Sequence, residues 1–192
     1  MELDPQKNRR ILVIDDNRAI HEDFRKILSP RVVPSEQLTE CGSSLFGDSE
    51  SGPPPPAFEI DSAYQGQEGV EFIEHSLAIN NPYAMAFVDV RMPPGVDGVE
   101  TTAMIWKKYA DLQVVICTAY SDYSWGGMQE KLGYSDRLFI LKKPFQPFEV
   151  LQLAVLMTSK WRLYAAIRGL PIAVKAEIAR RCGVVRSPKG TN

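Results

Sequence analysis

Cysteine and histidine are scarce in this chain, which has three cysteines and two histidines among 192 residues. Cys41, Cys117 and Cys182 are widely separated and form no Cys-x-x-Cys pair, so the sequence predicts neither a zinc site nor a disulfide framework. Isolated thiols in an odd number are typical of a reducing compartment, which predicts a cytoplasmic protein. Cys117 lies within an apolar segment and is expected to be buried.

Long apolar runs and an excess of positive charge are also missing. No segment is apolar over the length that a membrane span needs, and the first ten residues do not have the pattern of a secretory signal. The formal net charge is −2, which is not typical of a polyanion-binding chain. We therefore expect neither a membrane nor a nucleic acid as partner.

Five short apolar segments alternate along most of the chain with segments that have helical spacing. Most of the five are rich in Val, Ile and Phe without clean alternation, as in parallel strands that are covered on both faces. This order predicts an α/β fold with a doubly wound, five-stranded parallel sheet. The predicted strands are residues 10–15, 58–64, 84–90, 112–119 and 137–142.

Residues 30–57 interrupt this order between the first helix and the second strand. They are rich in Pro, Ser, Gly and acidic residues, and they replace the short loop that normally joins such elements. We interpret them as a flexible insertion within a domain of residues 1–160. Residues 161–192 are expected to form a C-terminal helical extension, a linker or an interaction tail.

The last predicted helix has a heptad-like apolar stripe that continues past the predicted sheet. Its end, near Trp161 and Tyr164, is expected to be exposed, and this predicts a homodimer through the C-terminal helix. The alternative is that the segment after Ile167 folds back and covers Trp161 within one chain. The stripe consists of Val150, Ala154, Met157, Trp161 and Tyr164.

Polar side chains follow four of the predicted strands at the point where each strand ends. Functional groups gather at the carboxyl ends of strands in an open parallel sheet, so we expect these side chains to converge. Clustered carboxylates repel one another, and a small hard dication such as Mg²⁺ would neutralise them. The residues are Asp15, Asp16, Asp89, Thr118 and Lys143.

Asp89 is the candidate nucleophile, because a carboxylate at such a site can take a phosphoryl group as an acyl phosphate. The metal and a lysine would stabilise the charge on the transferring oxygens, and Thr118 could donate a hydrogen bond to one of them. Taken singly, Asp89 could be a loop carboxylate, and one aspartate of the Asp15-Asp16 pair could cap a helix. The joint pattern favours the phosphoacceptor interpretation.

Four motifs carry a family resemblance: "ILVIDDN" (11–17), "AFVDVRMPPGVDG" (86–98), "VVICTAY" (114–120) and "LKKPF" (141–145). With these motifs in this order, the chain resembles the receiver domain of two-component response regulators. It is most similar to receivers attached to hybrid sensor kinases and cyclic-dinucleotide signalling proteins. The resemblance implies a flavodoxin-like receiver fold. It also implies a domain that is no enzyme beyond catalysing its own phosphorylation and dephosphorylation.

The resemblance also implies roles for single residues. Asp89 would be the phosphoacceptor, with Asp16 binding Mg²⁺ directly and Asp15 acting largely through water. The main-chain carbonyl of Arg91 would be another ligand, and the side chain of Arg91 is expected to be exposed.

Two further residues have roles by resemblance. Thr118 would be the switch hydroxyl, and Lys143 would pair with the phosphoryl group and precede a cis bond to Pro144. The implied partner is a histidine kinase or a phosphotransfer protein. Phosphorylation would change the face made by the fourth helix, the fifth strand and the fifth helix.

Three departures from the family pattern stand out. The loop "MPPGVDG" (92–98) has one residue more than usual, and Ile140 occupies the position of the switch aromatic, with Phe139 beside it. The third is the insertion at 30–57. His21 lies on the first predicted helix and is expected to be a surface residue rather than a phosphodonor.

Alternative functions follow from the same residues. A haloacid-dehalogenase-like phosphatase would need a second aspartate at position 91, where Arg91 stands. A phosphorylation-independent, receiver-like interaction module remains an alternative, as does a truncated regulator whose output domain lies outside this chain. Tyr120 and Trp125 could form a partner-facing patch or pack locally.

Overall fold

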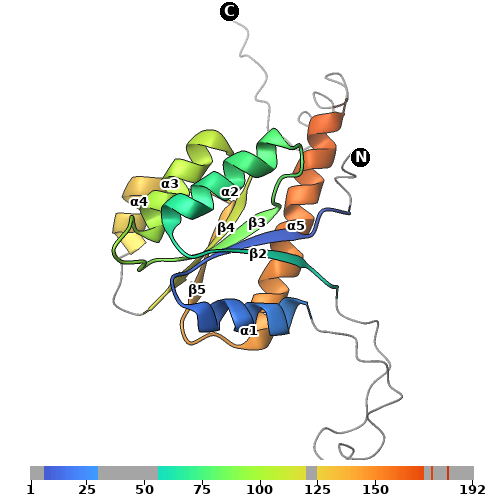
Figure 1. Ribbon diagram of the computed structural model, residues 1–192. Helices are drawn as coiled ribbons and strands as arrows, with labels where there is room; N and C mark the ends of the chain where they lie inside the picture. Colours follow the sequence, from blue (N-terminus) through green and yellow to red (C-terminus); the bar gives the residue numbers. More distant parts are fainter. Residues whose placement is uncertain (1–6, 30–55, 120–124, 171–173, 175–180, 182–192) are drawn as a thin grey trace, which may run out of the picture.

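The computed structural model describes residues 7–29, 56–119 and 125–170, together with residues 174 and 181. Strands and helices alternate along these residues (Figure 1). The strands are β1 Arg10–Ile14, β2 Glu59–Ala63, β3 Met85–Asp89, β4 Gln113–Thr118 and β5 Leu138–Lys142. The helices are α1 Arg18–Leu28, α2 Gly66–Ala78, α3 Gly98–Lys108, α4 Trp125–Leu132 and α5 Pro147–Gly169.

The five strands form one parallel sheet in the order β2-β1-β3-β4-β5. Helices α1 and α5 cover one face, and α2, α3 and α4 cover the other (Figure 1). Successive residues of β1 therefore enter different cores: Ile11 and Val13 pack toward α1 and α5, whereas Leu12 and Ile14 pack in the opposite cluster. Burial on both faces explains why β1, β3 and β4 show no polar alternation, and the predicted fold class is confirmed.

The predicted strand segments match the observed strands to within one or two residues at each end. Cys117 lies in β4 and is 2% exposed, as expected for a core residue. Cys41 and Cys182 lie outside the described residues. None of the helices described combines the length and the apolar character that crossing a bilayer requires.

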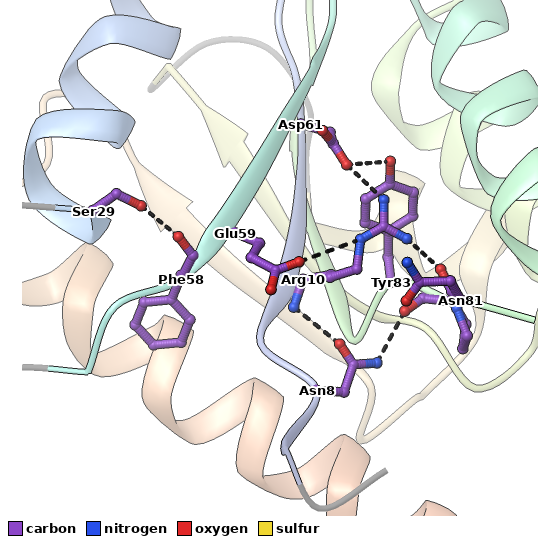
Figure 2. Close-up of polar contacts among 9 residues, drawn as sticks. Asn8, Arg10, Ser29, Phe58, Glu59, Asp61, Asn81 and Tyr83 are labelled. Carbon is purple, nitrogen blue, oxygen red and sulfur yellow. Dashed lines mark hydrogen bonds and ion pairs between the residues drawn. The ribbon is translucent and has the colours of Figure 1, made fainter. Parts of the chain in front are cut away.

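The two ends of the long insertion are held side by side, although residues 30–55 themselves lie outside the described part of the chain. The backbone N–H of Phe58 donates to the carbonyl oxygen of Leu28 at 3.0 Å. The hydroxyl of Ser29 donates to the carbonyl oxygen of Phe58 (Figure 2). The end of α1 and the start of β2 are therefore joined directly, independently of the residues between them.

Deletion of residues 36–55 is expected to leave the domain folded, and with it the phosphoryl acceptance that the resemblance implies. The contacts of Ser29 and Phe58 remain, and shortening a loop about threefold changes its closure entropy by only about 1 kcal/mol. Urea unfolding and phosphoryl labelling of the deletion variant would check this. An unfolded variant would show instead that Leu38, Leu45 or Phe46 packs on the core.

A polar network fixes the amino ends of β1 and β2 (Figure 2). The guanidinium of Arg10 donates to the carboxylate of Asp61 at 2.7 Å and to the carbonyl oxygen of Asn81. Tyr83 donates its hydroxyl to the same carboxylate at 2.7 Å, and its ring lies 4.3 Å from the Arg10 guanidinium. Burial and the bond to Asp61 raise the pKa of Tyr83, so it stays a neutral donor. The network sets the register of β2 against β1.

The C-terminal helix corrects one expectation. Helix α5 runs through position 160, and Met157 and Trp161 are each 3% exposed. The indole N–H of Trp161 donates to the hydroxyl of Tyr109 at 2.6 Å. The predicted exposed end of the stripe is therefore wrong, because the segment after α3 reaches the helix and covers it within one chain.

Tyr164, the last residue of the stripe, and the segment after Ile167 also bear on this expectation. The hydroxyl of Tyr164 donates to the carboxylate of Asp136 at 2.5 Å, so this residue too contacts its own chain. Of the segment expected to fold back, Ile172 lies outside the described residues and Val174 is 42% exposed. The apolar residues that α5 leaves exposed lie elsewhere on the helix: Phe148, Val155, Leu156 and Leu163.

Candidate functional site

The turn after β1 places two aspartates at the carboxyl edge of the sheet. Asp15 is 3% exposed, and its Oδ1 accepts a hydrogen bond from the N–H of Asn17 at 2.9 Å. Asp16 is exposed at the rim. Asn17, whose side chain accepts from the N–H of Ala19, caps α1. Neither aspartate is therefore needed as the helix cap, and both remain available to the site.

Asp89 is the last residue of β3 and is 8% exposed. Its Oδ2 accepts a hydrogen bond from the N–H of Arg91 at 3.0 Å, and the side chain of Arg91 is exposed, as expected. Gly98 packs against the backbone of Asp89: a Cβ at this position would lie 2.0 Å from the carbonyl oxygen of Asp89. A side chain at Gly98 would displace the end of β3, so glycine is required here.

The extra residue in the loop between β3 and α3 is accommodated within a turn. The N–H of Gly95 donates to the carbonyl oxygen of Met92 at 3.0 Å, and the Pro93–Pro94 peptide is cis. Gly98 then donates its N–H to Val90 at 3.0 Å, which brings the chain back beside β3. The carboxylate of Asp97 accepts from Glu100 at 2.8 Å and caps α3. The additional residue leaves Asp89 in place.

Lys143 links the two strand ends. Its ammonium donates to Oδ2 of Asp15 at 2.8 Å and to Oδ1 of Asp89 at 2.7 Å. The backbone N–H of Lys143 donates to the carbonyl oxygen of Thr118 at 2.8 Å, and its peptide bond to Pro144 is cis, as the resemblance implied. Lys142, the first lysine of the motif, is exposed and does not take part in these contacts.

The electrostatics of Asp89 and Lys143 are coupled. Burial raises the pKa of Asp89, and the hydrogen bond and charge of Lys143 offset this only in part. Burial by itself would lower the pKa of Lys143, but its bonds to Asp15 and Asp89 and their charges raise that pKa to about 12. At neutral pH the lysine is therefore a cation held against two carboxylates, of which Asp89 is incompletely stabilised.

The fourth strand ends beside these groups. Thr118 is 6% exposed and its hydroxyl donates to the carbonyl oxygen of Ala119 at 2.9 Å. Ile140 on β5 is partly buried and packs on the core cluster, while Phe139 is 44% exposed. Phe139 and Ile140 are neighbours in β5, so their side chains point to opposite faces of the sheet. Tyr120 and the side chain of Trp125 lie outside the described residues.

The three carboxylates together fit a small dication. Ligand oxygens of Asp15, Asp16 and Asp89 all lie within 4.8 Å of one another. All three are hard oxygen donors, and Lys143 supplies one positive charge against three negative ones. One exposed member, Asp16, leaves a route from solvent to the cluster. The donor set matches the chemistry that Mg²⁺ requires.

His21 was missed as a site residue and corrects the expectation that it lies on the surface. It is 0% exposed, and its Nε2 lies 2.7 Å from the carbonyl oxygen of Asp15. Its ring packs against Tyr64, which follows β2 at the same sheet edge, at 4.7 Å between centroids. One signal was available: His21 precedes the buried Phe24 and Leu28 by three and seven residues, which is the spacing of one helix face.

Comparison with known proteins gives a family match and several similar structures. The family model described as the response regulator receiver domain matches residues 55–155. These residues include Asp89, Thr118 and Lys143, whereas Asp15 and Asp16 precede the long insertion. No curated protein matches the sequence.

Solved structures are similar in fold over most of the chain. A CheY-like receiver domain protein from Methanospirillum hungatei is 20% identical with a TM-score of 0.57, covering 82% of this chain and 99% of that one. A response regulator receiver protein from Sinorhizobium medicae is 15% identical with a TM-score of 0.54, covering 81% and 98%. A structure described as an adenylate cyclase from Rhodopirellula baltica is 19% identical with a TM-score of 0.59, covering 83% and 93%.

Proposed function

Because the chain belongs to the family of response regulator receiver domains, we propose that it accepts a phosphoryl group on Asp89 from a histidine kinase or a phosphotransfer protein. The observation that carries the proposal is the position of Lys143, whose ammonium lies 2.8 Å from Asp15 and 2.7 Å from Asp89. A nucleophilic carboxylate, a second carboxylate and a cation for phosphoryl oxygens are thus assembled at one sheet edge.

The chemistry is a direct transfer to the carboxylate. An oxygen of Asp89 attacks the phosphorus, a new oxygen–phosphorus bond forms, and the phosphorus–nitrogen bond of the donor histidine breaks with the electron pair left on nitrogen. Burial leaves Asp89 less well solvated than a surface carboxylate, which favours attack. The product is an acyl phosphate that hydroxylamine cleaves.

The neighbouring residues stabilise the charge of the transferred group. Lys143 moves its hydrogen bond from the carboxylate of Asp89 to a phosphoryl oxygen, and the hydroxyl of Thr118 bonds another. Asp15, Asp16, Asp89 and the carbonyl of Arg91 would hold Mg²⁺. When bound, Mg²⁺ supplies the positive charge that offsets the phosphoryl oxygens.

Labelling by acetyl phosphate is expected to add one phosphoryl group per chain with Mg²⁺ and none with EDTA, as read by intact-protein mass spectrometry.

Asp16→Ala is expected to weaken Mg²⁺ binding more than Asp15→Ala. The reason is that the carboxylate of Asp16 is exposed to solvent, whereas the carboxylate of Asp15 already accepts hydrogen bonds from Lys143 and Asn17. Calorimetric titration with Mg²⁺ measures the affinity of each of the two variants. Equal binding by wild type and Asp16→Ala would contradict this metal site.

The output of the switch is expected on the face of α4, β5 and α5. An open groove of about 1050 Å³ lies there between β5 and α5, and Phe139, Phe148 and Leu156 are among its lining residues. We propose that phosphorylation changes this face for a cytoplasmic partner, and that the chain has no other enzymatic activity. A homodimer through the C-terminal helix, measured by light scattering with and without acetyl phosphate, and an output domain outside this chain both stay predictions.

A further inference from the structure

His21 is buried directly beneath the turn that carries the two aspartates. It belongs to α1, is 0% exposed, and brings its Nε2 to 2.7 Å from the carbonyl oxygen of Asp15. A buried histidine at such a position is unusual. An apolar side chain would fill the same space without burying a polar nitrogen that needs a hydrogen-bond partner.

The hydrogen bond shows which ring nitrogen of His21 is the donor. A carbonyl oxygen can only accept, so Nε2 must carry the hydrogen. The other nitrogen, Nδ1, is buried and has no hydrogen-bond partner among the described residues. The hydrogen bond from Nε2 to Asp15 is therefore the one polar contact that the described residues give this ring.

The bond from His21 completes the restraint of the Asp15 backbone. The N–H of Asp15 donates to the carbonyl oxygen of Ala63 on β2 at 3.1 Å, and its carbonyl accepts from His21. The His21 ring is itself held by Tyr64, over which the guanidinium of Arg18 lies at 5.0 Å. The peptide that joins Asp15 to Asp16 therefore cannot rotate without breaking a buried hydrogen bond.

We propose that His21 is a positioning residue: its Nε2–H holds the Asp15–Asp16 peptide so that both carboxylates face Asp89 before a dication binds. This rests on the proposed function. Without the bond the carbonyl of Asp15 would lose its buried donor, and the turn would rotate to find another. Asp16, exposed and at the end of this peptide, would then leave the position in which the three carboxylates lie within 4.8 Å.

The test compares four variants of the full chain for Mg²⁺ affinity, by calorimetry, and for stability, by urea unfolding. His21→Leu removes the donor and keeps an apolar filling. His21→Gln can place its amide nitrogen where Nε2 lies, and His21→Asn is too short to do so. Leu28→Ala is the control, because Leu28 is buried two turns further along α1 and lies away from the turn.

The expected result is a loss of Mg²⁺ affinity of about tenfold or more in His21→Leu and His21→Asn, the size typical of residues that orient metal ligands. His21→Gln should stay within about threefold of wild type, and Leu28→Ala should lose stability with its affinity unchanged. In wild type, imidazole ¹⁵N NMR should show the hydrogen of His21 on Nε2.

Other outcomes overturn the proposal. Equal affinity in the Gln and Asn variants, or a folded His21→Leu variant that binds Mg²⁺ like wild type, would reduce His21 to packing. If His21→Leu fails to fold, the Gln and Asn pair decides. The proposed function has a different test. A wild-type chain that is not labelled by acetyl phosphate in the presence of Mg²⁺ would refute the proposed function, and the role of His21 would then lose its basis. A wild-type chain that is labelled, with no effect of the His21 variants, would refute only the role of His21.

Discussion

Asp89→Asn is expected to abolish the hydroxylamine-labile label that acetyl phosphate leaves on the wild-type chain in the presence of Mg²⁺. The amide has the shape of the carboxylate but is a poor nucleophile, and it cannot form an acyl phosphate. Asp23→Asn is a matched control, because Asp23 lies on α1 with its side chain 56% exposed and is expected to keep full labelling. Full labelling of Asp89→Asn would overturn the assignment of the phosphoacceptor.

The same substitution is expected to raise the free energy of unfolding at neutral pH. Burial raises the pKa of Asp89 in the folded chain, so the folded state disfavours the ionised carboxylate that pH 7 imposes. A neutral amide removes this cost and the repulsion from Asp15. The gain should shrink as the pH falls through the folded pKa toward the ordinary value of an aspartate, because wild type then becomes protonated too. Urea unfolding of both proteins across this range would check the sign.

The ionised form of Asp89 lowers the free energy of unfolding, and it is also the form that the proposed phosphoryl transfer needs. The carboxylate that must attack phosphorus is kept partly desolvated, and the fold supplies the stability elsewhere, through strands that are buried on both faces. Sequence reasoning predicted that the candidate site residues converge, because parallel strands bring their carboxyl ends to one edge. Asp15, Asp89 and Lys143 needed only the correct strand order to converge.

What the sequence did not reveal depends on contacts between elements that are distant along the chain. Trp161 is covered by Tyr109, and no periodicity within α5 indicates which loop will lie over it. His21 has the spacing of the buried face of α1, but its polarity concealed this, and its partner is a backbone carbonyl that no side-chain pattern encodes. The extra residue between β3 and α3 disturbed the family pattern, yet glycine at position 98 still fixes the return of the chain.

Lys143→Met is expected to slow labelling of Asp89 at least tenfold and to destabilise the fold in the absence of Mg²⁺. The ammonium contacts two carboxylate side chains that are only 4% and 10% exposed, and methionine leaves both without a cation. The bonds to Asp15 and Asp89 raise the pKa of Lys143 from 10.5 to about 12, which corresponds to about 2 kcal/mol of stability. This stability is fully present below the ordinary lysine pKa and is lost as the pH rises through about 12.

Addition of Mg²⁺ should restore part of the stability that Lys143→Met loses, because a dication among the three carboxylates takes over the neutralising role of the ammonium. It should not restore the labelling rate, since the missing cation is the one that bonds a phosphoryl oxygen. Lys142→Met is the matched control: Lys142 is exposed and its loss should change neither quantity. Urea unfolding with and without Mg²⁺, beside the labelling rate, separates the two roles. If Lys143→Met behaved like Lys142→Met in both measurements, the charge bridge would be incidental and the proposed chemistry would lose its cation.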